Sequence, residues 1–185
     1  MLGTMLGDDE VLGIIPARGG SKRAPRKNIR DFRGKPLIVW SIESGMNSRF
    51  IDKLVVSTDD EEISEVAKAK GIDVVERPDD LSHDFATNED VMRHIIEKYD
   101  NYNWLVLLQP TSPLREGKDI DSCLLMAVKN RDGCVSYYKE NKNGAVYVCR
   151  KEFLEAGNNF DHEFATKYNM PQARSLDIDY DWQIE

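Results

Sequence analysis

The 185-residue sequence has little of what defines several common protein classes. Its three cysteines are an odd number without CxxC spacing, which is typical of reduced thiols and not of a disulfide framework. Its three histidines have no partners at metal-ligand spacing, so a zinc site is not expected. No apolar run approaches the roughly 20 residues that a membrane span needs. The first residues lack the basic and apolar regions of a signal peptide. These absences predict a cytoplasmic protein with no membrane partner.

An excess of positive charge is also missing. The formal net charge is −8 and the pI is near 5.0, which argues against a nucleic-acid partner. A hydrophobic content of 41% and a charged content of 31% are ordinary for a globular protein. The length suits one domain that buries roughly 70% of the surface of the unfolded chain. We find no internal repeat or linker, so residues 1–185 are expected to form a single domain.

Against this acidic background one loop is strongly basic. The stretch "GIIPARGGSKRAPRKN" runs from an apolar segment, residues 11–16, into two glycines and a series of cations. Residues 18–33 hold seven of the 25 basic residues and one acid, Asp31. Glycine backbone N–H groups and Arg or Lys side chains are suited to phosphate oxygens. The loop matches neither GxxxxGK[ST] nor GxGxxG, so the P-loop and dinucleotide fingerprints are absent. A solvated basic turn is the alternative.

The rest of the sequence alternates strand patterns with helix patterns. Strands are expected at 11–16, 54–56, 72–75 and 104–108, and helices at 37–46, 61–70, 88–99 and 118–130. Thr58 with Glu61, and Thr87 with Asp90, have the spacing of helix caps. Two further strands, "GCVSYY" and "GAVYVC", are separated by "KENKN", and a short helix is expected near 151–156. The pattern predicts an α/β fold with a mostly parallel sheet and helices on both faces.

Ligands of such sheets bind outside the carboxyl ends of the strands, where the basic loop and residues 109–115 are expected. Asp177 and Asp179, in "SLDIDYDWQIE", would project from one face of an extended segment. A pair of carboxylates together with substrate phosphates suits Mg²⁺. Taken alone, the pair is a weak signal, because acidic residues at this spacing are most often a solvated strand edge.

These elements together resemble the acylneuraminate cytidylyltransferases, the CMP-sialic acid synthetase family. The matching segments are "IIPARGGSKRAPRKNI", "GKPLI", "VVSTDD", "ERPDDLSHDFAT", "LLQPTSPLR", "NGAVYV" and "LDIDYDW". They occur in the family's order through nearly the whole chain. Related enzymes that activate Kdo share the fold but differ in the first loop, so "GSKRAPRKN" favours the sialate branch.

The resemblance implies a Rossmann-like nucleotidyltransferase that transfers CMP from CTP to the anomeric hydroxyl of a nonulosonic acid. Pyrophosphate is the second product and Mg²⁺ the cofactor. By matching position, the residues that would bind the triphosphate are Arg18, Gly19, Gly20, Ser21 and Lys27. Those that would place the cytidine are Asn28, Arg77 and the segment 84–87, which includes Thr87. Gln109 would face the sugar, and Asp177 and Asp179 would bind the metal. The catalytic residues would be Arg18, Lys27 and Asp177.

The resemblance breaks near residues 138–144. Family members have roughly fifty more residues here, which supply a dimerisation lobe and basic groups for the sugar's carboxylate. Lys142 is the available substitute as a carboxylate-binding cation. Three explanations stay open: another acidic sugar of the pseudaminic or legionaminic type, groups borrowed from a partner, or a segment missing from the sequence. A homodimer is therefore left open. The alternatives in function are a nucleotidyltransferase for another acidic sugar, or a CTP-binding protein without catalysis.

Overall fold

The computed structural model describes the chain except for residues 1–5, 21–23, 84, 132, 161–165 and 185. Seven strands form the central sheet: β1 (Val11–Pro16), β4 (Lys53–Thr58), β5 (Asp73–Glu76), β6 (Trp104–Leu107), β7 (Cys134–Tyr138), β8 (Asn141–Arg150) and β9 (Thr166–Asn169). Their spatial order is β5-β4-β1-β6-β8-β7-β9. The pairs β6–β8 and β7–β8 are antiparallel and the remaining pairs are parallel. The predicted mostly parallel α/β sheet is confirmed.

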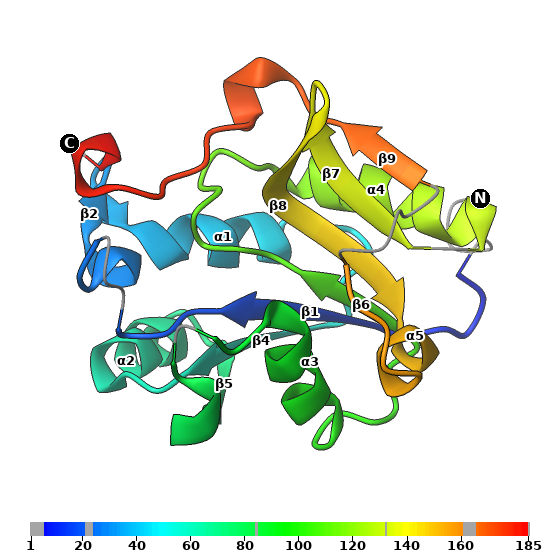
Figure 1. Cartoon of the computed structure of the whole chain (residues 1–185), viewed down its shortest axis with the longest axis horizontal. Coiled ribbons are helices and arrows are strands. Elements are labelled where there is room, and N and C mark those ends of the chain that lie inside the picture. The colour runs from blue at the N-terminus through cyan, green and yellow to red at the C-terminus, as the bar shows by residue number, and fades with distance from the viewer. Residues whose placement is uncertain (1–5, 21–23, 84, 132, 161–165, 185) are drawn as a thin grey trace.

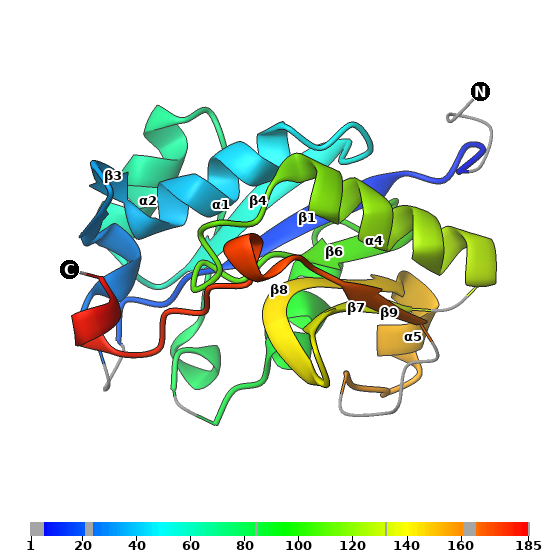
Figure 2. The same ribbon diagram turned by 90° about the horizontal axis from the view of Figure 1, so that it is seen from above.

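Helices cover both faces of this sheet (Figures 1 and 2). One face packs against α1 (Leu37–Met46), α2 (Glu61–Ala69) and α4 (Gly117–Asn130). The other packs against α3 (Asn88–Ile96) and α5 (Lys151–Glu155). The central position of β1 explains why its sequence is apolar. Val11 and Ile15 pack in the core cluster on the first face, and Leu12 and Ile14 pack in the cluster on the other face. A central parallel strand is buried on both sides.

The helix caps confirm one prediction and correct another. Thr87 and Asp90 form a reciprocal capping box at the start of α3, as predicted. Helix α2 begins differently, because Asp60 is its cap and accepts a hydrogen bond from the Ile63 N–H at 3.1 Å. The Thr58 hydroxyl instead accepts from the Asp60 N–H. Asp60 also carries a negative charge at the helix N-terminus, where the dipole stabilises it.

Two other expectations about local structure were incomplete. Strand β8 begins at Asn141, so only Lys139 and Glu140 separate it from β7, and Lys139 adopts the left-handed conformation (φ 54°). The sequence did not predict β9 or the small hairpin of β2 (Asp31–Phe32) and β3 (Lys35–Pro36). Met46, the last residue of α1, is 57% exposed. No helix in the described part of the chain has the length and apolar character to cross a bilayer.

After β9 the chain passes back across the sheet to the first loop (Figures 1 and 2). A single-turn helix, η3 (Gln172–Arg174), is followed by a segment without regular structure and then by η4 (Asp181–Gln183). This return brings Ile178 and Ile184 into a small core cluster with Phe32 and Leu37. Arg30 and Asp181 form an ion pair across the same junction. The loop after β1 and the C-terminal segment therefore meet beside the carboxyl ends of β1 and β6.

Candidate functional site

A cavity of about 270 Å³ lies at this junction. Its lining includes most of the residues selected from the sequence: Arg18, Lys27, Asn28, Arg77, Thr87, Gln109, Asp177 and Asp179. They come from the loops after β1, β5 and β6, from the N-terminus of α3 and from the C-terminal return. His83 and Thr111 also line the cavity and were not selected. Ser21 and Asp84 lie outside the described residues.

The first loop is fixed by polar contacts to its own backbone and to the end of β4. The Asn28 side chain, only 6% exposed, donates to the Arg18 carbonyl at 3.0 Å. The Gly19 N–H donates to Asp59 Oδ1 at 2.8 Å. The Arg26 guanidinium contacts the Asp60 carboxylate at 3.1 and 3.2 Å. The acids of "VVSTDD" thus hold the cationic loop at the rim of the sheet.

The two glycines of this loop differ in their surroundings, which gives a direct test. A Cβ added at Gly19 would lie 2.5 Å from Asp60 Oδ2 and 2.9 Å from Asp60 Cβ, whereas one added at Gly20 meets nothing within 4 Å. We expect Gly19→Ala to lower the melting temperature by several degrees, because the added methyl group overpacks against Asp60 and lowers the free energy of unfolding by roughly 1–3 kcal/mol. Gly20→Ala should leave it within about 1 °C, because its methyl group enters open space. Differential scanning calorimetry measures both; equal melting temperatures would show that Asp60 does not confine the loop.

Arg77 lies in the wall of the cavity and is 6% exposed. Its Nε donates to Ser57 Oγ at 3.2 Å and its Nη2 to the Ser57 carbonyl at 2.9 Å. Burial lowers the pKa of Arg77 to about 10, Asp59 opposes this shift, and the nearby Arg18 adds to it. Arg77 therefore stays a cation at neutral pH. Two guanidinium groups that repel each other in a partly desolvated cavity favour binding of an anion.

Asp177 is the most unusual carboxylate of the cavity. Its Oδ1 is buried without a hydrogen-bond partner among the described residues. Burial raises the pKa of Asp177; a hydrogen bond from Thr111 and the charge of Lys27 oppose the rise, and the charge of Asp179 adds to it. Two carboxylates in one cavity, one with an oxygen that no donor satisfies, are suited to a divalent cation with oxygen ligands. The chemistry of this donor set fits Mg²⁺.

Gly144, in the quoted segment "NGAVYV", is a site residue that the sequence did not reveal. It has φ +73°, and a Cβ there would lie 2.6 Å from Gln109 Oε1 and 3.7 Å from Asp177 Oδ2. The absence of a side chain lets the Gln109 amide approach β8 beside the carboxylates. The signal was available only as an NG pair at the start of a strand pattern, which indicates a turn as readily as a close approach.

Lys142 was predicted to receive the sugar's carboxylate, but it is not among the residues that line the cavity. It lies on the exposed part of β8, and its ammonium group donates to the Phe160 carbonyl. This placement does not favour the predicted role. The described Lys and Arg residues of the cavity are Arg18, Lys27 and Arg77.

Arg115 supports the cavity from behind and was also missed. It is 3% exposed and joins three elements: its donors reach Ser41 and Ser44 of α1, the Gln109 carbonyl, and the Ala145 carbonyl of β8. Burial lowers the pKa of Arg115 to about 9, and the charge of Asp119 opposes the shift. Arg115 therefore remains charged at neutral pH and fixes the backbone of Gln109.

The comparisons with known proteins agree with this geometry. A family model described as cytidylyltransferase matches residues 12–167, most of the chain. The chain belongs to the cytidylyltransferase family. Among relatives, it is 49% identical over 170 residues to pseudaminic acid cytidylyltransferase of Campylobacter jejuni, covering 89% of this chain and 72% of that protein. It is 29% identical over 206 residues to N-acylneuraminate cytidylyltransferase of Escherichia coli, covering 92% of this chain.

This cytidylyltransferase spans only 49% of the length of the Escherichia coli relative. It is also 41% identical over 118 residues to CMP-N,N'-diacetyllegionaminic acid synthase of Legionella pneumophila, covering 60% of this chain and 50% of that protein. Among solved structures, CMP:2-keto-3-deoxy-manno-octonic acid synthetase complexed with CTP has a TM-score of 0.74 at 16% identity, covering 93% of this chain and 94% of that one. That likeness confirms the nucleotidyltransferase fold.

Proposed function

We propose that this chain transfers CMP from CTP to the anomeric hydroxyl of a nonulosonic acid and releases pyrophosphate. The observation that carries the proposal is the meeting of Arg18 and Lys27, from the first loop, with Asp177 and Asp179, from the C-terminal return, in one cavity. Cations suited to a triphosphate thus lie beside carboxylates suited to its metal. The relatives' names, cytidylyltransferases and a CMP-sugar synthase for nonulosonic acids, support the choice of nucleotide and sugar class.

In the proposed mechanism the sugar hydroxyl attacks the α-phosphorus, and the bond to the β-phosphate oxygen breaks. Negative charge grows on the leaving pyrophosphate, where Arg18 and Lys27 stabilise it. Gly19 and Gly20 do not line the cavity, and the Gly19 N–H already donates to Asp59, so this structure does not favour their predicted contact with the triphosphate. Arg77, Asn28 and the segment that ends at Thr87 hold the cytidine, so that the phosphate is presented in one orientation. Gln109, whose backbone is held by Arg115 and whose amide lies close to Gly144, orients the sugar by hydrogen bonding.

Asp177 and Asp179 are the proposed metal ligands. When bound, Mg²⁺ neutralises phosphate charge and lowers the pKa of a coordinated hydroxyl. The buried, unpartnered Oδ1 of Asp177 is the observation that supports this assignment. Lys27 donates to the Ile178 carbonyl at 3.1 Å and so links the proposed phosphate-binding loop directly to the residue between the two carboxylates.

Within the nonulosonic acids, we propose a pseudaminic-type substrate. The identity of 49% to the Campylobacter jejuni protein, against 29% to the Escherichia coli protein, supports this choice. The lengths of the two alignments support the same choice. The alignment to the Campylobacter jejuni protein has 170 positions and covers 89% of this chain, whereas the alignment to the Escherichia coli protein has 206 positions and covers 92%. The Escherichia coli relative therefore has residues, between aligned positions, that this chain lacks.

The test is to incubate the protein with CTP, Mg²⁺ and a panel of pseudaminic, legionaminic and N-acetylneuraminic acids, and to detect CMP-sugars by mass spectrometry. We expect CMP-pseudaminic acid to form fastest. Parallel reactions with UTP and GTP test the base, and faster pyrophosphate release with either nucleotide contradicts the CTP assignment. Formation of CMP-N-acetylneuraminic acid at an equal rate contradicts the preference for the pseudaminic type.

A second candidate function is CTP binding without catalysis. One observation favours it: the described Lys and Arg residues of the cavity are those proposed to bind the nucleotide, and Lys142, the cation predicted to bind the sugar, lies outside the cavity. Such a protein would show thermal stabilisation by CTP and no turnover with any sugar acid. The Asp177–Asp179 pair weighs against it, because nucleotide binding alone gives no reason to keep an unpartnered buried carboxylate.

A further inference from the structure

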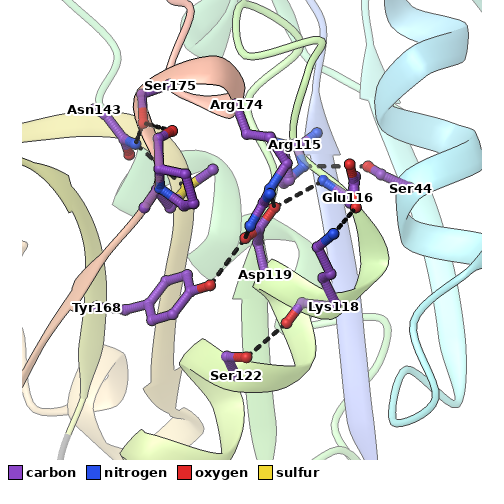
Figure 3. Close-up of polar contacts among 12 residues, drawn as sticks. Ser44, Arg115, Glu116, Lys118, Asp119, Ser122, Asn143, Tyr168, Arg174 and Ser175 are labelled. Atoms are coloured by element: carbon purple, nitrogen blue, oxygen red, sulfur yellow. Dashed lines mark hydrogen bonds and ion pairs between the residues drawn. The ribbon is translucent and has the colours of Figure 1, made fainter.

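Asp119, in the first turn of α4, gathers contacts from three separate parts of the chain (Figure 3). It is 0% exposed. Arg174 of η3 binds it with two donors, Nε at 2.8 Å and Nη2 at 2.9 Å. The Tyr168 hydroxyl of β9 donates at 2.9 Å, and the Glu116 N–H donates at 3.0 Å. The hydrogen bonds of Arg174, Tyr168 and Glu116 lower the pKa of Asp119 against the effect of burial, so its charge is retained.

Arg174 stands directly before the segment that carries the two cavity carboxylates. That segment, residues 175–179, has no regular secondary structure, so its shape depends on contacts with its neighbours. The Asn143 amide donates to Ser175 Oγ at 3.2 Å (Figure 3), and the Ile178 N–H donates to the Thr111 carbonyl at 2.8 Å. The segment is therefore attached at its start to α4 and β8, and near its end to the loop after β6.

The attachment at Arg174 differs in kind from the others. A guanidinium that binds a buried carboxylate with two parallel donors fixes both distance and orientation, whereas a single hydrogen bond permits rotation. Asp119 is itself held by the start of α4, directly after the loop that contains Gln109 and Thr111. The Arg174–Asp119 pair thus fixes the position of the C-terminal return relative to the loop that contains Gln109 and Thr111.

We propose that Arg174 and Asp119 are positioning residues that hold Asp177 and Asp179 in the geometry of a divalent-cation site. The proposal rests on the metal-binding role in the proposed function. Neither residue lines the cavity, so their effect passes through the backbone between Arg174 and Asp177. The pair acts as an outer support of the ligands, like the hydrogen-bond partners that orient metal ligands elsewhere.

The test is Arg174→Lys, which keeps the charge but loses the two-donor geometry. CTP affinity is measured by calorimetry in EDTA and at a series of Mg²⁺ concentrations. We expect the Mg²⁺ concentration for half-maximal enhancement of CTP binding to rise about 10-fold or more. CTP affinity in EDTA should change by less than about twofold, because the cations of the first loop are untouched.

The matched control is Arg49→Lys. Arg49 also binds an α4 carboxylate, Asp121, with Nε at 2.9 Å, but the side-chain hydrogen bonds of Asp121 within the described part of the chain go to Ser48 and Arg49 and not to the C-terminal return. We expect this variant to keep the wild-type Mg²⁺ response. A wild-type Mg²⁺ response in Arg174→Lys, or an equal rise in both variants, overturns the proposal.

Tyr168→Phe is the second variant, used if Arg174→Lys does not fold. It removes one hydrogen bond to Asp119, and a rise of about 2- to 3-fold in the Mg²⁺ requirement is expected. An unchanged requirement in this variant counts against the proposal. If CTP binding by the wild-type protein does not respond to Mg²⁺ at all, the metal role in the proposed function is wrong, and the positioning role falls with it.

Discussion

Replacing Asp177 with Asn is expected to lower kcat by a factor on the order of 10²–10³ and to raise the melting temperature. The loss of activity follows from removing a charged ligand of the proposed metal site. The gain in stability follows from burial of the carboxylate. Oδ1 of Asp177 has no hydrogen-bond partner among the described residues, and a charged carboxylate is disfavoured in the partly desolvated wall of the cavity. A neutral amide reduces that cost by about 1 kcal/mol, or roughly 2–4 °C.

Steady-state kinetics at saturating CTP and calorimetry of the same preparation measure the two effects. Asp181→Asn is the control, since it makes the same change of charge a few residues away at an exposed ion pair with Arg30. We expect its kcat within about threefold of wild type and its stability unchanged or slightly lower. Turnover of Asp177→Asn near the wild-type rate would exclude a catalytic role for this carboxylate.

Replacing Arg115 with Met is expected to destabilise the fold by about 3 kcal/mol or more. The substitution keeps an unbranched, apolar stem but removes donors from the Gln109 and Ala145 carbonyls and from two serine hydroxyls, at buried or part-buried positions. For a chain of this size the melting temperature should fall by roughly 6–12 °C. The same change frees the backbone of Gln109, so we also expect the KM for the sugar acid to rise more than the KM for CTP.

Chemical denaturation and kinetics with each substrate varied in turn measure these effects. Lys118→Met, in the first turn of α4, is the control: Lys118 makes an exposed ion pair with Glu116, and its loss should cost less than about 0.5 kcal/mol. If Arg115→Met were no less stable than Lys118→Met, the buried hydrogen bonds of Arg115 would contribute little. A parallel rise in both KM values would contradict the specific effect on Gln109.

The layers of the fold could be predicted from the sequence because the patterns that indicate these helices and strands are local. The apolar segment of β1, the capping box of α3 and the helix pattern of α4 each lie within a few consecutive residues. The short strands β2, β3 and β9 carry two to four residues each and have too little pattern to be recognised.

The residues of the cavity also divide into those that the sequence predicted and those that it did not. Arg18, Lys27, Asp177 and Asp179 were selected because their residue types are suited to phosphates and metal, and all four line it. Gly144, Arg115 and Arg174 were missed because their contacts join residues that are far apart in the sequence. Lys142 was selected by charge alone, and charge does not reveal that its side chain turns toward Phe160. The α2 cap was assigned to Thr58 because the capping spacing fits it, although the acid two residues later caps the helix.

The return of the chain after β9 bears on how the protein is made. Every strand of the sheet is complete at Asn169, whereas the acidic wall of the cavity is contributed only by the residues that follow. On the ribosome, the sheet and its helices can assemble before the last ligands emerge from the exit tunnel. A nascent chain that stops before Asp177 would then be compact yet lack the acidic wall of the cavity.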